Sequence, residues 1–460
     1  MRVSAKVLIT ALVLGAALTG ARAQTAPNLS AFRLLLPMST LLNSPAGRAA
    51  LASNLAVTGA IQAGTAQQPR LESLAAERER SLADATFTSD NAYQLADGLG
   101  TTLGGAYQSL ASYTSSDDGK TVRATNVAAS VGVLIGYTSG VTNGDSASSK
   151  NFFGNETIVI RGQAAPVSAE ASALLASANG TPDVFGKAYG RPAGSPGADP
   201  YGDSRPFQTE PSVTTFSGTD YFGVPASNQD FLRGPRQRII DSPSFPSGHT
   251  TYGYTESLLL ALLVPARYPQ MIVRAAEYGN DRIVIGAHYA MDVLGGRSLA
   301  YYDIAHLLAG DPAYLGLTFR GNTIDNYGSA LVAARADLTH ALEARCGAPI
   351  ATCAAADTSR FHDDAAEAGF YESTQTYGLA VVYPAQANVR EDVATLAPEA
   401  ATLLTAAFPS LTAAEADRIL TDTEGPGGGF LDDGSRFGIY SRLDLYAAAK
   451  RAAQLTRNRP

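Results

Sequence analysis

The chain has 460 residues, a formal net charge of -8 and 17% charged residues. An acidic chain without runs of Lys or Arg is a poor match for nucleic acid or for an anionic membrane, because both attract basic surfaces. A small anionic substrate would therefore need a local cationic cluster that works against the overall charge.

The first 23 residues have the composition of a secretory signal peptide. Arg2 and Lys6 precede an apolar stretch from Val7 to Gly20, and Ala21-Arg22-Ala23 supplies a small-x-small cleavage pattern. The apolar stretch is short for a bilayer span. We expect cleavage near Ala23, export to the periplasm or the medium, and a mature protein without an integral membrane span.

The patterning of the next 225 residues or so is partly helical. Residues 24–65 are weakly patterned, and we expect them to wrap the surface. Apolar residues spaced by three and four predict helix over 69–113. Helix and strand compete over 121–142, and 166–178 is typical of a short Ala-rich helix. Residues 179–248 are dense in Gly, Pro, Asp and Ser, which is typical of a functional loop or a disordered segment.

Regular helix is expected again from about His249 to Leu308, with breaks. Further helices are predicted over 327–345, 397–408 and 443–455. The pattern predicts a mainly α fold, with a helical-bundle core and long polar loops around one end.

The C-terminal part offers no motif that we can tie to chemistry. Cys346 and Cys353, the two cysteines of the chain, are separated by six residues. In an oxidising compartment they would form a local disulfide that stabilises the fold by roughly 2–3 kcal/mol. We do not expect a metal site. Asp432 and Asp433 follow a Gly-rich stretch and are interpreted as a solvated turn.

Pro246-Ser247-Gly248-His249 stands directly before a helical run. Pro and Ser suit the start of a helix, and Gly lets the backbone approach a ligand closely. The exposed N–H groups and the positive end of the helix dipole would bind an anion, with His249 facing the same space. Taken alone, these residues also describe a capped helix with an incidental His.

A second pattern begins at Arg282 and continues with His288 and Asp292. The last two are four residues apart, so on a helix they share a face. A carboxylate there can hold one imidazole nitrogen in the N–H form, which leaves a lone pair on the other, as a nucleophilic His needs. Arg282 offers a planar fork of donors suited to phosphate. The alternative is an ion pair on a helix surface.

Basic residues next to proline occupy the loop upstream. Lys187 is followed by Arg191-Pro192, and Arg205-Pro206-Phe207 comes further along. On their own these residues are typical of a solvated turn.

The three motifs follow one another in the order Lys/Arg-Pro, Pro-Ser-Gly-His and Arg-x5-His-x3-Asp. Together they resemble the tripartite signature of the type 2 phosphatidic acid phosphatase and vanadium haloperoxidase superfamily. The second and third motifs match residue by residue, with 32 residues between His249 and Arg282. The first departs from the pattern, because three residues separate Lys187 from Arg191 and seventeen separate it from Arg205, where the family has six. Arg205 is the better match, since Arg-Pro-Phe is the usual form, and Arg191 is the alternative.

The resemblance implies a role for each matched residue. His288 would attack phosphorus, Asp292 would orient it, and His249 would protonate the leaving oxygen. The residues that would bind the phosphate oxygens carry cationic groups or N–H and O–H donors: Lys187, Arg205 or Arg191, Ser247, Gly248 and Arg282.

The chain looks most like the soluble, exported branch of the superfamily. That resemblance implies an acid phosphatase that hydrolyses small phosphomonoesters through a phosphohistidine, is inhibited by vanadate and requires no metal or other cofactor. One alternative is a vanadate-dependent haloperoxidase that uses the same site. The other is a non-catalytic exported protein.

The expected organisation has three parts. A signal peptide covers 1–23, a helical phosphatase domain covers 24–345 and holds the motifs within 187–292, and a mainly helical extension over 346–460 packs on the core. We expect a small phosphomonoester as the partner and no nucleic acid.

Overall fold

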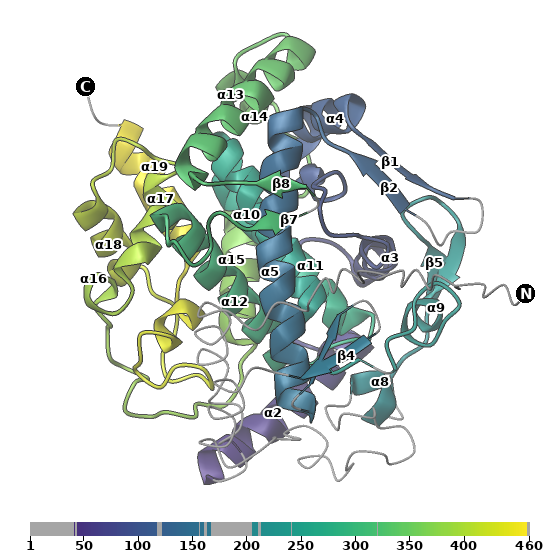
Figure 1. Cartoon of the computed structure of the whole chain (residues 1–460). Helices are drawn as coiled ribbons and strands as arrows, with labels where there is room; N and C mark the ends of the chain where they lie inside the picture. Colours follow the sequence, from purple (N-terminus) through teal and green to yellow (C-terminus); the bar gives the residue numbers. More distant parts are fainter. Residues whose placement is uncertain are drawn as a thin grey trace, which may run out of the picture.

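The computed structural model describes residues 41, 44–116, 122–155, 157–160, 163–166, 205–209, 213–240, 242–319 and 321–457. Helices dominate these ranges, and the strands form short antiparallel pairs (Figure 1). The expected mainly α fold is confirmed. The predicted signal peptide and residues 167–178 of the predicted Ala-rich helix lie outside the described residues. Within the described ranges, no helix combines the length and apolar character needed to cross a membrane.

The centre of the fold is formed by α10 (Gly248–Leu263), α11 (Tyr268–Val284) and α12 (Ala290–Ala309), which pack against one another. Almost all of their residues are buried, and this includes the polar face of α11. The predicted helical run from His249 to Leu308 is confirmed. Its breaks fall at the short turn η3 (Pro265–Arg267) and between α11 and α12.

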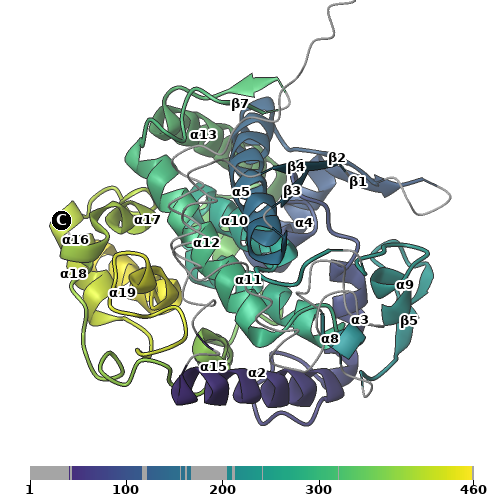
Figure 2. The same ribbon diagram turned by 60° about the horizontal axis from the view of Figure 1, so that its bottom comes forward.

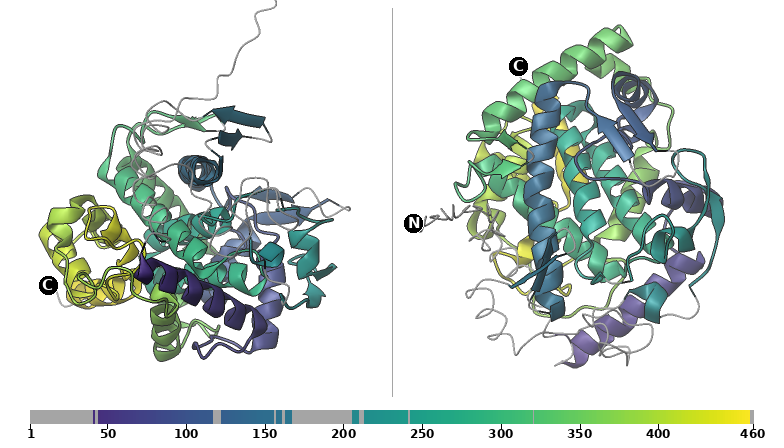
Figure 3. Two further views of the ribbon diagram at one scale, coloured as in Figure 1. Left: turned by 90° about the horizontal axis from the view of Figure 1, so that it is seen from below. Right: turned by 45° about the vertical axis from the view of Figure 1, so that its right-hand side comes forward.

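Two long helices cover the centre. α5 (Ala129–Asn155) packs along α10 and α12, and α13 (Tyr327–Cys346) packs against α5 and α10. In the right-hand view of Figure 3, α5 lies in front of the central helices and the C-terminal helices lie behind them. The segment 121–142, where helix and strand compete in the sequence, contains both, since strand β2 (Val122–Thr125) precedes α5.

α2 (Pro45–Ala63) lies across one end of the central helices (Figure 2). The prediction of weakly patterned surface chain over 24–65 is wrong for this segment. Ser44 caps α2 by accepting a hydrogen bond from Gly47 N at 2.9 Å, and Gly64 ends it with a φ of 79°. The Ser-Pro start and the Gly end were the readable signals, and an Ala-rich composition obscured them.

The other helices that precede α10 in the chain lie outside the central group of helices. They are α3 (Leu74–Asp84), η2 (Leu95–Leu99), α4 (Gly100–Leu110), α8 (Pro206–Thr209) and α9 (Asn228–Leu232). The strands pair as β1 (Ser112–Ser115) with β2, β3 (Thr157–Ile160) with β4 (Gln163–Pro166), β5 (Ser217–Thr219) with β6 (Pro225–Ser227), and β7 (Thr318–Phe319) with β8 (Asn322–Thr323).

The C-terminal segment packs on the side of the core away from the β1–β2 hairpin (Figures 1 and 2). Its hydrophobic residues belong to the same cluster as those of α10, α11 and α12. The helix predicted over 397–408 is two short turns, and the one predicted over 443–455 is α19. The elements are α14 (Ile350–Ala355), α15 (Asp364–Thr376), α16 (Val393–Leu396), η4 (Pro398–Ala401), α17 (Thr402–Thr405), α18 (Ala413–Asp422), η5 (Gly438–Ser441) and α19 (Leu445–Arg457).

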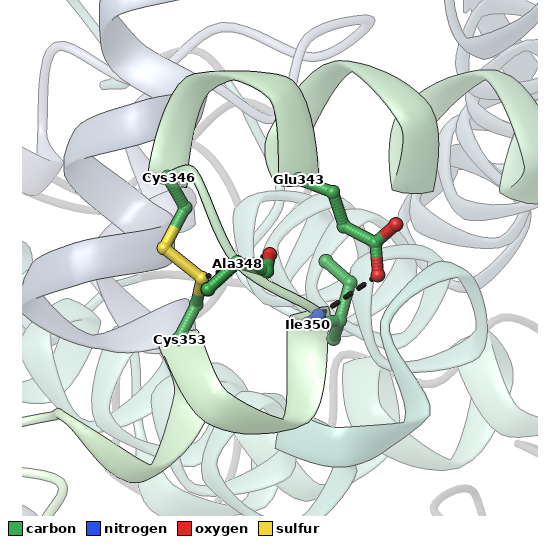
Figure 4. Close-up of a disulfide and its surroundings, with 5 residues drawn as sticks. All are labelled: Glu343, Cys346, Ala348, Ile350 and Cys353. Carbon is green, nitrogen blue, oxygen red and sulfur yellow. Dashed lines mark hydrogen bonds between the residues drawn. A yellow bond between two sulfur atoms is a disulfide. The ribbon is translucent and has the colours of Figure 1, made fainter.

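A disulfide joins Cys346, the last residue of α13, to Cys353 in α14, with their Cα atoms 6.5 Å apart (Figure 4). Beside it, Ile350 N donates to Glu343 Oε1 at 2.9 Å. The two interactions fix the turn through which the chain leaves the core helices and enters the C-terminal segment.

The interpretation of Asp432 and Asp433 as a solvated turn is wrong for Asp432. Its side chain is buried, and Oδ2 accepts a hydrogen bond from Gly428 N at 2.6 Å. Arg442 Nε lies 3.8 Å from the same carboxylate. The Gly-rich loop therefore folds around Asp432, whereas Asp433 is exposed.

Buried arginines tie the outer elements to the centre. Arg274 of α11 donates to both carboxylate oxygens of Asp84, each at 2.7 Å, and to Asp97 at 2.7 Å. Arg360, after α14, donates to Glu277 at 2.6 and 2.7 Å and to Asp97 at 2.7 Å. These ion pairs attach α3, η2 and the C-terminal segment to α11.

Several buried carboxyls hold their protons more tightly than free ones do. Glu367 of α15 is fully buried, and Gln270 of α11 donates to its Oε2 at 3.1 Å. Burial, helped by the charge of Asp364, raises the pKa of Glu367 to about 7. Burial also raises the pKa of Asp145 and of Asp303.

We expect the free energy of unfolding to be larger at about pH 5 than at about pH 8. The folded protein binds the Glu367 proton more tightly than the unfolded chain, so this stabilisation is complete below about pH 4.5 and is lost as the pH rises through about 7. The loss is at most about 1.4 kcal/mol per pH unit for each such carboxyl. Urea unfolding across this range measures it. Glu367→Gln should flatten the dependence, and an unchanged slope in that variant would contradict the assignment.

Candidate active site

The second motif lies directly against the start of α12. Ser247 N donates to Asp292 O at 3.0 Å. A Cβ on Gly296 would lie only 2.6 Å from Ser247 O, so glycine is required for this close approach. The two motifs, separated in sequence by most of α10 and α11, therefore meet through their backbones.

The first turn of α10 forms an anion site. Ser247 is its N-cap, and its Oγ accepts from Thr250 N at 3.2 Å and from Thr250 Oγ1 at 2.8 Å. The Ser247 hydroxyl still has its own proton to donate. The N–H groups at the start of a helix have no carbonyl partner within it, and the helix dipole is positive there. Ser247, Gly248 and His249 thus stand where an anion is favoured.

His288 and Asp292 meet in a way that differs from the expected shared helix face. His288 lies in the turn before α12, and Tyr289 is the N-cap of that helix. Asp292 Oδ2 lies 3.2 Å from His288 Nδ1 and accepts from Tyr289 N at 2.9 Å. Ser244 Oγ donates to the same oxygen at 2.5 Å. Asp292 therefore caps the helix and orients the imidazole at once.

Arg205 fixes the other edge of the imidazole. Its Nη1 lies 3.0 Å from His288 Nε2 and donates to Ala287 O at 3.0 Å. The same Nη1 lies 3.5 Å from His288 Nδ1, so this contact does not select one ring nitrogen. Asp292 does, because an ionised carboxylate only accepts, and its contact with Nδ1 favours the proton there and the lone pair on Nε2. Ser242 O and Pro243 O accept from Arg205 at 2.8 and 2.9 Å and hold its fork in place.

Arg282 is buried, at 1% exposure, and no carboxylate of the described residues forms a salt bridge with it. Its backbone oxygen accepts from His288 N at 3.2 Å, so the end of α11 and the turn with the imidazole are joined. All three guanidinium nitrogens lack a hydrogen-bond partner among the described residues. Burial lowers the pKa of Arg282. A buried guanidinium of this kind calls for an anionic ligand.

His249 projects from the first turn of α10. Its Nε2 lies 3.3 Å from the side-chain nitrogen of Gln237, and its ring centroid lies 5.9 Å from that of Tyr252. Gln237 and Tyr252 therefore set the orientation of the imidazole.

The structure brings Arg205, His288 and Asp292 into contact, and joins Ser247 and Arg282 to them through the backbone. Lys187 and Arg191 lie outside the described residues. The sequence did not point to Ser244 or Gln237. The first stands two residues before the motif, in a loop whose hydroxyls gave a weak signal, and the second has no spacing that marks it.

The arrangement can bind a tetrahedral oxyanion and attack it. The buried guanidinium of Arg282, a helix N-terminus and a serine hydroxyl supply donors, the charge of Arg205 lies beside them, and an imidazole presents a lone pair on Nε2. Groups of this kind neutralise the charge that develops in phosphoryl transfer.

Known proteins share parts of this chain. An acid phosphatase of Zymomonas mobilis is 44% identical over 72 residues, which are 16% of this chain and 27% of the relative. A non-specific acid phosphatase of Salmonella typhimurium is 39% identical over 64 residues, 14% of this chain and 26% of the relative. One of Providencia stuartii is 29% identical over 87 residues, 19% of this chain and 34% of the relative. The chain thus spans between about a quarter and a third of these relatives.

No solved structure matches the chain significantly. Residues 186–310 match the family model described as the PAP2 superfamily. That segment contains Arg205, both histidine motifs and the helices that position them. The match and the identities with acid phosphatases show that this part of the chain is similar to the PAP2 superfamily.

Proposed function

We propose that the protein is an exported acid phosphatase that hydrolyses small phosphomonoesters through a phosphohistidine at His288. The observation that carries the proposal is the contact of His288 Nδ1 with Asp292, because a proton held on Nδ1 leaves the lone pair on Nε2. The names of the relatives, all acid phosphatases, support the substrate class.

In the first half of the reaction, His288 Nε2 forms a bond to phosphorus as the bond to the leaving oxygen breaks. The ring becomes cationic while Nδ1–H stays bonded to Asp292, whose carboxylate stabilises that charge. His249 donates a proton to the leaving oxygen, so that an alcohol departs. The leaving oxygen needs this proton because an alkoxide is a poor leaving group, and His249 is the acid that we propose for it.

In the second half, water attacks phosphorus and gives a proton to His249. The bond between phosphorus and Nε2 breaks, and its electron pair returns to the imidazole. Orthophosphate leaves, and both histidines regain their starting protonation states. The cycle consumes one water per ester and needs no other reactant.

Charge neutralisation would come from the protein. Arg205 and Arg282 are buried beside the reacting turn, and Lys187 of the first motif would add a third cation. Three cationic side chains can perform the role that Mg²⁺ performs in other phosphoryl-transfer enzymes. We therefore propose that hydrolysis requires no metal or cofactor.

Export follows from the first 23 residues. If cleavage occurs after Ala23, protein recovered from the periplasm or medium would begin at Gln24. A disulfide between Cys346 and Cys353 is consistent with an oxidising compartment.

The first test is hydrolysis of p-nitrophenyl phosphate at about pH 5 to 6 by the purified protein, with EDTA and with or without orthovanadate. We expect turnover that resists EDTA and is inhibited by vanadate, which mimics the pentacoordinate transition state. Loss of turnover in EDTA would overturn metal independence. Bromide oxidation with vanadate and peroxide, in a protein that hydrolyses no ester, would assign a haloperoxidase instead.

His288→Ala should lower kcat by at least about 1,000-fold, because it removes the nucleophile and leaves only the binding groups. Steady-state hydrolysis of p-nitrophenyl phosphate measures this loss, with circular dichroism as the check on folding. His340→Ala is the matched control, since His340 is an exposed histidine on α13. Activity near wild type in His288→Ala would remove the proposed nucleophile.

His249→Ala should separate substrates by their leaving groups. Hydrolysis of glycerol 2-phosphate should fall about 100-fold more than that of p-nitrophenyl phosphate, because only the alkoxide needs protonation. The measurement is the ratio of kcat/KM for p-nitrophenyl phosphate to kcat/KM for glycerol 2-phosphate, compared between the variant and the wild type. This ratio does not depend on the concentration of active enzyme. Equal losses on both esters would contradict the role of His249 as the acid.

A further inference from the structure

Three long polar side chains recur at every fourth residue of α11, so they lie on one face of the helix. Arg274 is bonded to Asp84 and Asp97. The guanidinium of Arg282 and the hydroxyl of Tyr278 are buried, and neither has a hydrogen-bond partner within the part of the chain that the structure describes. One face of α11 thus carries Arg274, whose guanidinium is bonded to carboxylates, followed by Tyr278 and Arg282, whose polar groups could bond to a ligand.

The ring of Tyr278 is fixed between two helices. A Cβ on Gly253 of α10 would lie 2.2 Å from Tyr278 Cδ1, so the ring occupies the space that this glycine leaves. On its other side, Phe87 packs edge-to-face at 5.2 Å between ring centroids, and Leu95 joins the same cluster. The ring cannot turn its hydroxyl to solvent. A buried donor without an acceptor destabilises the fold, whereas a ligand that accepts from it is bound more tightly.

The hydroxyl and the guanidinium act on each other. Burial raises the pKa of Tyr278 above its usual range, and the charge of Arg282 is the strongest opposing influence. The electrostatic influence is mutual, since Tyr278 also acts on the pKa of Arg282. Long side chains on a helix lean back toward its N-terminus, which brings a residue toward the one four positions earlier. Tyr278 therefore keeps its proton and offers it beside the cation.

None of the nearby carboxyls in the described residues is hydrogen-bonded to Arg282. Asp84 already accepts two hydrogen bonds from Arg274 at 2.7 Å. Burial, with the charges of Asp84 and Glu277, raises the pKa of Asp281 well above its usual value. The N–H groups of Arg282 can therefore bond to an incoming anion.

We propose that Tyr278 is a phosphate-binding residue whose hydroxyl donates to the same phosphoryl group as Arg282. The identity of the anion rests on the proposed phosphatase function, and the pairing of the two donors rests on the contacts of α11. A neutral donor adds a directed hydrogen bond without further charge repulsion among the cations. It would favour tetrahedral oxyanions over halides or carboxylates of similar charge.

Tyr278→Phe tests this, because it removes one oxygen and leaves the packing of the ring. We expect orthophosphate to bind about 10-fold more weakly, seen as weaker protection against thermal unfolding and a higher inhibition constant. kcat/KM for p-nitrophenyl phosphate should fall between about 10- and 100-fold. The matched control is Tyr107→Phe, since Tyr107 on α4 is equally buried and its hydroxyl likewise has no partner among the residues described.

The outcomes separate this inference from the proposed function. A wild type that hydrolyses the ester, with phosphate binding unchanged in Tyr278→Phe, would overturn the inference and leave the phosphatase intact. A wild type that binds phosphate but hydrolyses no ester, with binding weakened in Tyr278→Phe, would overturn the phosphatase and support the oxyanion site. If Tyr278→Phe and Tyr107→Phe weakened phosphate binding equally, the loss would come from removing any buried hydroxyl. That result would contradict the proposal.

Discussion

A guanidinium keeps its charge at any pH that a protein meets, so each buried arginine must find acceptors or a ligand. Arg205, Arg274, Arg282 and Arg297 are among the largest fully buried side chains of this fold. Three of them are bonded within the protein: Arg274 by carboxylates, Arg205 and Arg297 mainly by backbone oxygens. Arg282 differs, because no described residue accepts from its guanidinium. The same constraint that holds the helices together thus identifies Arg282 as the arginine that would favour a bound anion.

Both reactive histidines stand at the beginning of a helix. His249 is in the first turn of α10, and His288 is in the turn before α12. A helix start supplies unpaired N–H groups and a positive dipole, and α10 and α12 pack against each other, so the two starts share one space. Buried helices on all sides leave this space little freedom to change shape. Positioning of this kind is the main requirement for phosphoryl transfer.

The sequence was informative where a structural feature depends on neighbouring residues. Ser247 as a helix cap and the contact of His288 with Asp292 both follow from spacings of a few residues. Even there, the detail differed, because the His288–Asp292 contact belongs to a capped helix start and not to a helix face. α2 was missed because its caps are the only strong signals in an Ala-rich segment.

Features that depend on the packing of distant segments could not be predicted. The contact of Arg205 with His288 spans a loop whose length departs from the family pattern, so spacing left Arg191 as an alternative. Gln237 reaches His249 from a loop without periodicity. Nothing in the residues around Arg282 indicated that its side chain would be buried and unpaired, because that outcome depends on where α3 and α10 place their own side chains.

The carbonyl groups that hold Arg297 have a consequence for how this protein could be divided. Arg297 lies on α12, about one and a half turns beyond Asp292, and donates to the backbone oxygens of Thr374, Gln375 and Ser441. All three acceptors belong to the C-terminal segment, beyond the part that matches the family. A fragment cut at the end of α13 would lose these three acceptors and would expose the apolar side chains that pack against the C-terminal segment. The part of the chain that matches the family model is therefore not a portable module, and a graft or truncation would have to cover that surface again.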